Sequence, residues 1–303
     1  MRICSFLPSA TEILFALGLG ESVAGVTYEC DFPEEARQKP VVVNTRLAPS
    51  TNSAEIDRQV SEFMARGESL YRIETDLLRK IQPDLIVTQD LCRVCAASPG
   101  ELGSTLAALP QEPEVLSLNP RTLGDVWNDI LSVGRVTGRS DSASMMVEEI
   151  RGRVSAVERA VSSAAGRPRV LCLEWLDPPF IGGHWVPDMV QCAGGADVLG
   201  RIGEPSCRVD WETVLAAQPE VIVVMPCGCH LKEAVEGFRN VHLPQGWKDL
   251  PAVASGRVFA VDASAYFSRP GPRLVDGVEI LAHLFHPGKA PKPACDYAIA
   301  QLI

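Results

Sequence analysis

The sequence predicts an α/β fold: two α/β sandwich lobes with mostly parallel sheets, joined by one long α-helix. Short apolar runs, several of them β-branched throughout, alternate with helical stretches, and this alternation is typical of βαβ units. The runs fall into two sets, which predicts two sheets. The first set comprises residues 2–6, 22–27, 83–88 and 114–118, and the second comprises 169–175, 220–225 and 257–261.

A long helical region separates the two sets of strands. Residues 122–136 form one predicted helix, and a second runs from Ser140 to about Ala164, with Val147, Ile150 and Val157 on one apolar face. About 24 residues rising 1.5 Å each span roughly 36 Å, the width of a domain. The second helix is therefore expected to connect the lobes stiffly. The predicted parts are an N-terminal lobe (1–139), the connecting helix (140–166), a C-terminal lobe (167–287) and a weakly packed tail (288–303).

Composition excludes several classes of function. The 303 residues are 46% hydrophobic and 22% charged, with a net charge of −10, which is typical of a globular protein and unlike a disordered chain. An acidic chain without a basic run argues against nucleic acid and anionic membranes as partners. No apolar run approaches the roughly 18–20 residues of a membrane span. Phosphate-loop, nucleophile-elbow and dinucleotide motifs are absent, so an enzyme is not the first expectation.

The N-terminus and the cysteines led us to expect a cytoplasmic protein. The predicted strand at residues 2–6 is followed at once by a helix over residues 9–17, with Ser9 and Glu12 spaced as a capping box. This leaves no room for a secretory leader. Cys4 and Cys172 lie inside apolar runs and are expected to be inert core residues. A periplasmic or surface location is the alternative if a leader has been removed.

Polar and aromatic residues follow the predicted strands, where open parallel sheets bind ligands. These residue types suit a large, flat, partly apolar ligand. The candidate ligand-binding residues are Pro8, Ser9, Tyr28, Glu29, Tyr71, Gln89 and Asp90 in the first lobe, and Trp175, Phe180, His184, Trp185, Tyr266, Phe267 and Arg269 in the second.

Cysteine-rich loops offer a second kind of site. A C-x-x-C and a C-x-C follow strands of different lobes, and with Cys30 they would hold a soft metal if they converged. A redox pair or simple free thiols are the alternatives. The candidate metal ligands are Cys30, Cys92, Cys95, Cys227 and Cys229, with His184 and His230 as further candidates.

Several segments resemble those of a known family. The matching segments are residues 5–12, 25–33, 83–87, 177–180, 190–199, 212–224 and 266–273. Over about residues 1–287 the chain is similar to the periplasmic-binding proteins with a long connecting helix, which serve ABC importers of cobalamin, haem and iron–siderophores. An extra stretch, about residues 44–73, departs from this pattern.

The resemblance implies a ligand cleft between two lobes, and binding and delivery without catalysis. It places Phe180, Tyr266, Phe267 and Arg269 in segments that line the cleft, and Glu212 at the position that docks on a permease. The main hypothesis is a protein that binds cobalamin or a related corrinoid, for an ABC importer or for intracellular carriage, with no required cofactor. A haem or iron–siderophore binder is the alternative, and a metal- or thiol-dependent enzyme is the alternative of another class.

Overall fold

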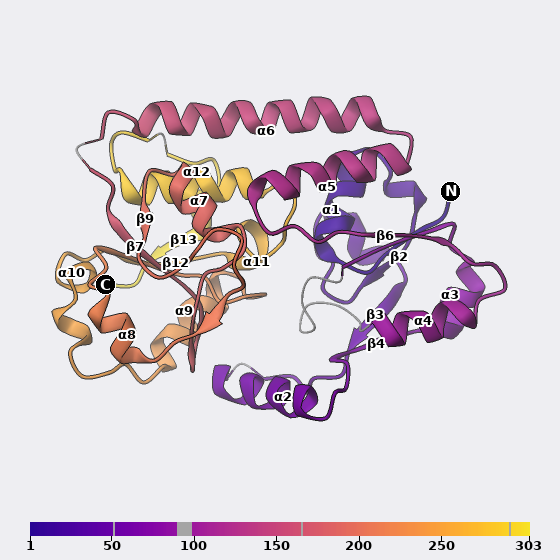
Figure 1. Ribbon diagram of the computed structural model, residues 1–303, viewed down its shortest axis with the longest axis horizontal. Coiled ribbons are helices and arrows are strands. Elements are labelled where there is room, and N and C mark those ends of the chain that lie inside the picture. Colours follow the sequence, from indigo (N-terminus) through magenta and orange to yellow (C-terminus); the bar gives the residue numbers. More distant parts are fainter. Residues whose placement is uncertain (51, 90–98, 165, 291) are drawn as a thin grey trace. The chain divides into compact units, whose positions relative to one another are not determined.

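The computed structural model describes residues 1–50, 52–89, 99–164, 166–290 and 292–303, and the chain divides into two compact units (Figure 1). The first comprises Met1–Pro49, Arg58–Pro120 and Trp127–Val147, and the second comprises Ser50–Asp57, Arg121–Val126 and Glu148–Ile303. Among the described residues, no helix is both long and apolar enough to cross a membrane.

The first unit contains a six-stranded sheet in the order β4-β3-β2-β1-β5-β6. All neighbouring strands are parallel except β3 and β4. The strands are β1 (Ile3–Ser5), β2 (Val23–Thr27), β3 (Val41–Thr45), β4 (Tyr71–Ile73), β5 (Leu85–Thr88) and β6 (Glu114–Ser117). The helices of this part of the chain are α1 (Pro8–Ala16), α2 (Ser53–Ala65), α3 (Thr75–Ile81), α4 (Pro99–Ala107) and α5 (Leu123–Val136), with 3₁₀ turns η1 (Gly20–Ser22) and η2 (Glu34–Gln38).

The capping box predicted for the first helix is wrong. Helix α1 begins at Pro8, and its N-cap, Leu7, makes no side-chain cap hydrogen bond. Proline suits the first helical position because its φ is fixed near the helical value and the missing N–H is not needed there. Ser9 therefore lies inside the first turn, where it is buried.

The core of the first unit forms between its sheet and the helices. Cys4, Phe6, Val42, Val43, Ile73, Leu78 and Ile86 make one buried cluster. Burial raises the pKa of the Cys4 thiol to about 12, so the thiolate is not populated at neutral pH. The prediction that Cys4 is a core residue is confirmed.

The second unit contains a mixed sheet in the order β10-β8-β7-β11-β12-β13, with β9 beside β7. Strands β7, β11, β12 and β9 are parallel, whereas β8, β10 and β13 run antiparallel to their neighbours. The strands are β7 (Arg169–Leu176), β8 (Pro179–Ile181), β9 (Ala196–Asp197), β10 (Cys207–Arg208), β11 (Val221–Val224), β12 (Val258–Val261) and β13 (Ile299–Gln301).

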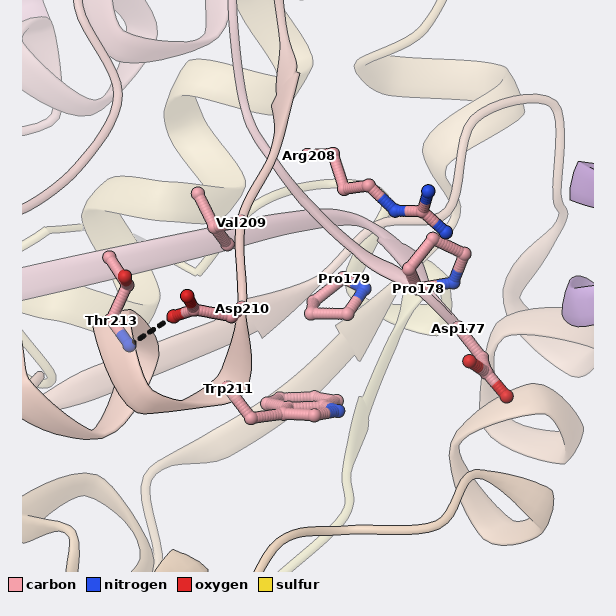
Figure 2. Close-up of a pocket in the computed structure, with 8 residues that line it drawn as sticks. All are labelled: Asp177, Pro178, Pro179, Arg208, Val209, Asp210, Trp211 and Thr213. Carbon is pink, nitrogen blue, oxygen red and sulfur yellow. Dashed lines mark hydrogen bonds between the residues drawn. The ribbon is translucent and has the colours of Figure 1, made fainter. Parts of the chain in front are cut away.

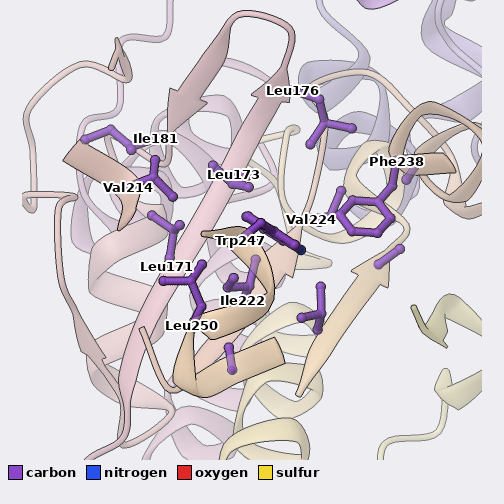
Figure 3. Close-up of a cluster of buried hydrophobic side chains, with 14 residues drawn as sticks. Leu171, Leu173, Leu176, Ile181, Val214, Ile222, Val224, Phe238, Trp247 and Leu250 are labelled. Atoms are coloured by element: carbon purple, nitrogen blue, oxygen red, sulfur yellow. The ribbon is translucent and has the colours of Figure 1, made fainter. Parts of the chain in front are cut away.

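Leucine, isoleucine and valine side chains of β7 and β11 pack around Trp247 to form the main core of this unit (Figure 3). Phe238 and Trp211 both contact the Trp247 ring, at centroid distances of 6.1 and 5.8 Å. The helices are α6 (Ser140–Val161), α7 (Val186–Cys192), α8 (Trp211–Ala216), α9 (Leu231–Asn240), α10 (Pro251–Ala254), α11 (Ala263–Tyr266) and α12 (Leu274–Phe285), with 3₁₀ turns η3 (Trp247–Asp249) and η4 (Asp296–Ala298).

The long predicted helix is α6, which spans 22 residues and ends at Val161. Val147, Ile150, Val157 and Val161 are buried, as their spacing predicts. Arg153 on the same helix donates to Glu279 at 2.9 and 2.8 Å and to Asp276 at 2.5 Å, both on α12. This ion-pair network fastens the C-terminal part of α6 to the second unit.

The C-terminal tail differs from the prediction. Instead of packing weakly, it adds β13 to the sheet, with Val261 opposite Ile299 and Phe259 opposite Gln301. All seven predicted strands are present within two residues of their expected ends, whereas β3, β4, β8, β9, β10 and β13 were not predicted.

Candidate functional site

A hollow of about 660 Å³ opens on the second unit where β7 turns into β8 and β10 leads into α8 (Figure 2). Its lining combines apolar rings with three charged side chains. The lining residues are Asp177, Pro178, Pro179, Arg208, Val209, Asp210, Trp211 and Thr213. The volume lies within the range of about 300–1,000 Å³ that is usual for small-molecule sites.

The local sequence explains how this hollow is built. Asp177 and Pro178 make the turn from β7 into β8, Pro179 begins β8, and the pairing of Phe180 with Arg208 brings β10 alongside. Asp210 then caps α8, because its Oδ1 accepts a hydrogen bond of 2.7 Å from the Thr213 amide. The hydrogen bonds from Thr213 lower the pKa of Asp210, so its carboxylate is charged at neutral pH.

Trp211 is the main residue that the sequence reasoning missed. Its ring stands edge-on to the buried Trp247 at an interplanar angle of 84°, which holds the indole in place while part of it faces the hollow. The sequence feature that could have revealed Trp211 is its position directly after Asp210, the N-cap residue of α8. An indole, two proline rings and a rim of two carboxylates and one guanidinium can hold a ligand with a flat apolar face and polar edges.

Two predicted aromatic residues lie beside this hollow. Trp175 and Phe180 are cross-strand neighbours at the β7–β8 turn, and both are half-buried. The Trp175 indole N–H donates to the Ser53 carbonyl oxygen at 3.2 Å within the same unit. Both rings are therefore partly exposed and available to contact a ligand bound in the hollow.

His184 and Arg269 are also half-buried. His184 has φ 51°, and its main chain bonds Glu204 and Gly203 at 2.6 and 3.0 Å. Burial lowers the pKa of its imidazole, and Arg121 lowers it further, so the neutral ring is favoured. These main-chain bonds fix His184 against the segment that leads to β10.

Three predicted ligand aromatics lie in the interior instead. Phe267 is 1% exposed, Tyr266 is 6% exposed and Trp185 is 7% exposed. The Trp185 indole donates to the Phe267 carbonyl oxygen at 2.8 Å, and Tyr266 bonds the hydroxyl of Tyr297. This corrects the expectation that these rings line an open site: their apolar faces fill the space under the loops.

The predicted residues of the first unit follow β1, β2 and β5, except Tyr71, which begins β4. Ser9 and Gln89 are buried, and Pro8, Glu29 and Tyr71 are half-buried. Tyr28 is 43% exposed, and Phe32 on the same loop is 45% exposed. Burial of the Tyr28 hydroxyl, followed by the nearby Glu29, raises the pKa of Tyr28, so the phenol stays protonated. Phe32 lies in a segment that carries the family resemblance but was not among the predicted ligand-binding residues, and Asp90 lies outside the described residues.

The candidate metal ligands are not gathered in the described part of the chain. No group of three or more His, Cys, Asp or Glu side chains there is arranged to hold a metal. Cys30 is buried beside Thr11, with 3.1 Å between Sγ and Oγ1. Cys227 is exposed, and burial raises the pKa of Cys229 to about 11. Cys92 and Cys95 lie outside the described residues.

Two half-buried carboxyl groups, those of Glu174 and Asp197, lie near the segment between β8 and α7. The Glu174 side chain accepts from the Gly183 amide at 3.3 Å, and burial raises its pKa to about 7, with Asp197 contributing in the same direction. Burial also raises the pKa of Asp197 to about 6, although its carboxyl accepts from two amides. Asp197 lines a second hollow, of about 410 Å³. The two raised pKa values predict that the stability of this segment depends on pH.

Comparison with known proteins assigns the chain to a family. The family described as periplasmic binding protein matches residues 3–265. The chain belongs to this family. Its members are solute-binding proteins, and the resemblance seen in the sequence is confirmed.

Curated relatives cover most of the chain. The vitamin B12-binding protein of Vibrio cholerae is 24% identical over 283 residues, which cover 92% of this chain and 86% of the relative. An uncharacterized ABC transporter substrate-binding lipoprotein, YvrC of Bacillus subtilis, is 23% identical to this chain. The match covers 94% of this chain and 80% of the YvrC sequence.

Solved structures show the same two-lobed α/β fold. The periplasmic haem-binding protein RhuT of Roseiflexus sp. RS-1 has a TM-score of 0.70 and 24% identity to this chain. The match covers 94% of this chain and 97% of the RhuT chain. The periplasmic vitamin B12-binding protein BtuF of Vibrio cholerae has a TM-score of 0.65 and 22% identity to this chain. The match covers 94% of this chain and 96% of the BtuF chain. The predicted fold class is confirmed.

The expected cytoplasmic location is wrong. The matched family is that of periplasmic binding proteins, and its similar members are named as periplasmic proteins or as a lipoprotein. These findings point to the periplasm or the cell surface. Cysteine content misled the prediction because the buried thiols Cys4 and Cys172 are protected by packing, whatever the redox state of the compartment.

Proposed function

We propose that this protein binds a corrinoid, cobalamin or a close relative, and delivers it to an ABC importer without transforming it. The observation that carries the proposal is the hollow walled by Trp211, Pro178 and Pro179. A corrin macrocycle has a broad apolar face and an edge of amide groups. The ring surfaces suit the face, while Arg208 and Asp177 at the rim suit the amides.

Charge supports a corrinoid over an anionic siderophore. The hollow has Asp177 and Asp210 but only one cationic side chain, Arg208, in its lining. A chelate with several negative charges would be repelled by the two carboxylates. Neutral amides, by contrast, accept hydrogen bonds from a guanidinium and donate them to carboxylates. The relatives named vitamin B12-binding proteins support the same choice, since they match over 92% of the chain.

Haem is the second candidate. It is favoured by the fold neighbours that are named haem-binding proteins. Haem shares the flat face of a corrinoid but carries two carboxylates, which would pair mainly with the Arg208 guanidinium. Binding of haem in preference to cobalamin would replace the corrinoid proposal.

Glu212 is the proposed contact to a permease. Its side chain is exposed in the first turn of α8, next to Trp211. A Glu212→Gln variant should keep its affinity for the ligand and lose stimulation of the transporter's ATPase activity. Equal stimulation by the variant and the natural protein would contradict this role.

Calorimetric titration with cyanocobalamin, haemin and a ferric hydroxamate tests the proposal directly. Cyanocobalamin should bind with one-to-one stoichiometry, and Trp211→Ala and Phe180→Ala should each weaken binding by about 1–3 kcal/mol. Met145→Ala, which removes an exposed apolar side chain on α6, is the control. Unchanged affinity in both aromatic variants would refute the site, and absence of corrinoid binding would refute the function.

A further inference from the structure

A row of three paired residues crosses one end of the second sheet. Trp175 on β7 lies opposite Phe180 on β8, and Phe180 lies opposite Arg208 on β10. Directly opposite residues of antiparallel strands point their side chains to the same face. Neighbouring strands lie about 4.8 Å apart, so the main chains of Trp175 and Arg208 are about 10 Å apart. Arg208, at the outer end of the row, lines the hollow beside Trp211 (Figure 2).

The start of α2 contacts both ends of this row. The Trp175 indole N–H donates to the Ser53 carbonyl oxygen at 3.2 Å, and the Arg208 guanidinium lies 3.6 Å from the Asp57 carboxylate. Ser53 and Asp57 are four residues apart, which places them on one face of α2, about 6 Å apart along its axis. Residues Ser50–Asp57 belong to the second unit, as Trp175 and Arg208 do. Two contacts therefore hold Asp57 beside the guanidinium of the hollow.

The Asp57–Arg208 pair matters more for the charge of the hollow than for the stability of the protein. The Asp57 side chain is 21% exposed and the Arg208 side chain is 60% exposed, and ion pairs in contact with water contribute little to stability. Asp57 adds a third carboxylate to those of Asp177 and Asp210, against the single guanidinium in the lining. Asp57 therefore makes the surroundings of the hollow more negative by one charge.

This pair acts differently on two kinds of ligand edge. A guanidinium carries five N–H donors, so Arg208 can bond Asp57 and still donate to the oxygen of a neutral amide. A ligand carboxylate would instead compete with Asp57 for the guanidinium, and the Asp57 charge would repel it. The arrangement therefore favours an edge of amides over an edge of acids on the same macrocycle.

We propose that Asp57 is a specificity-determining residue, which pairs with Arg208 and so makes the hollow select macrocycles with amide edges over macrocycles with carboxylate edges. The inference rests on the proposed function, since it takes the ligand to be a macrocycle bound in this hollow. It deepens that function by assigning the choice between amide and acid edges to a residue of α2.

Two corrinoids that differ only at their edges are the probes. Dicyanocobinamide carries amides around the corrin ring, and in dicyanocobyrinic acid carboxylates take their place. Calorimetry gives the ratio of the two dissociation constants, acid form over amide form, which should exceed one for the natural protein. Asp57→Asn should lower this ratio about three- to tenfold, because one repelling charge is lost and the guanidinium becomes available. The decrease should shrink between about 50 mM and about 500 mM salt, since salt screens exposed charges.

A second variant tests whether Asp57 acts through Arg208. In an Arg208→Gln background, Asp57→Asn should lower the ratio by a smaller factor, because residues that act as a pair are not additive. Glu68→Gln is the matched control, since it removes the same charge from an exposed ion pair with Arg66 in the first unit and should leave the ratio unchanged. The melting temperature of Asp57→Asn should stay close to that of the natural protein.

The outcomes separate this inference from the proposed function. If the natural protein binds dicyanocobinamide and Asp57→Asn gives the same ratio, the role of Asp57 is refuted and the function stands. An equal decrease with and without Arg208 refutes action through the ion pair. If haemin binds and neither corrinoid does, the corrinoid proposal fails, and haemin compared with its dimethyl ester tests Asp57 by the same ratio. A natural protein that binds none of these chelates refutes both.

Discussion

The half-buried Glu174 carboxyl should make the folded protein lose stability as the pH rises. Its pKa is about 7 in the folded protein, against an ordinary value of 4.5. Because the folded pKa is the higher one, the folded state holds the proton more tightly, and this advantage is complete below pH 4.5 and lost as the pH rises to about 7. At about 1.4 kcal/mol for each pKa unit, the loss is about 3 kcal/mol.

Glu174→Gln removes this titration and keeps the shape of the side chain. The free energy of unfolding, measured in urea by tryptophan fluorescence from pH 4.5 to pH 8, should rise for the variant relative to the natural protein by about 3 kcal/mol across that range. Comparing the two proteins at each pH cancels the contributions of the other carboxyl groups. Glu204→Gln, which changes an exposed acid on the adjoining segment, is the matched control and should not reproduce this gain.

A difference between natural protein and Glu174→Gln that stays constant with pH would refute the reasoning. It would show that Glu174 carries its charge in the folded state at low cost. The neighbouring Asp197 contributes in the same direction, so the double variant Glu174→Gln, Asp197→Asn should not exceed the sum of the single effects.

Two further predictions concern packing. Gly183→Ala should destabilise the protein by about 3 kcal/mol or more, because a Cβ there would stand 2.0 Å from a main-chain nitrogen. Gly237→Ala on α9 should instead stabilise it by up to about 1 kcal/mol, because a Cβ there would lie 3.6 Å from the Leu176 side chain, an ordinary contact distance. Urea unfolding checks both, and a stable Gly183→Ala protein would contradict the tight turn. Iodoacetamide should modify the exposed Cys227 in the folded protein and leave the buried Cys4 and Cys172 unmodified until urea is added. Peptide mass spectrometry measures the labelling at each cysteine. Labelling of Cys4 or Cys172 without urea would contradict their burial in the core.

Central strands could be predicted from the sequence, because a strand covered on both faces must be apolar throughout. The run Val221–Val224 on β11 is completely buried and carries its own signal. Strands β8, β10 and β13 have two or three residues each and exist only because a longer strand lies beside them. The partners of β10 and β13 are far away in the sequence, and β8, although it forms a hairpin with β7, is too short to show a strand pattern, so local patterns did not reveal these strands.

The candidate site was predicted less well than the fold. Carboxyl ends of strands could be located from the sequence, and Phe180 lies there half-buried as expected. Whether an aromatic residue in a loop faces solvent or the core depends on the packing of other elements. Phe267 faces inward under α12, whereas Trp211 stays partly exposed because its edge rests on Trp247.

The last strand also covers one border of the second sheet. β13 occupies the hydrogen-bonding groups along one side of β12, which would otherwise be the open border of the second sheet. A bare border of this kind, formed by the apolar run Val258–Val261, is a template on which a strand from another molecule can pair. A chain shortened before Ile299 would therefore expose this border and should be prone to self-association.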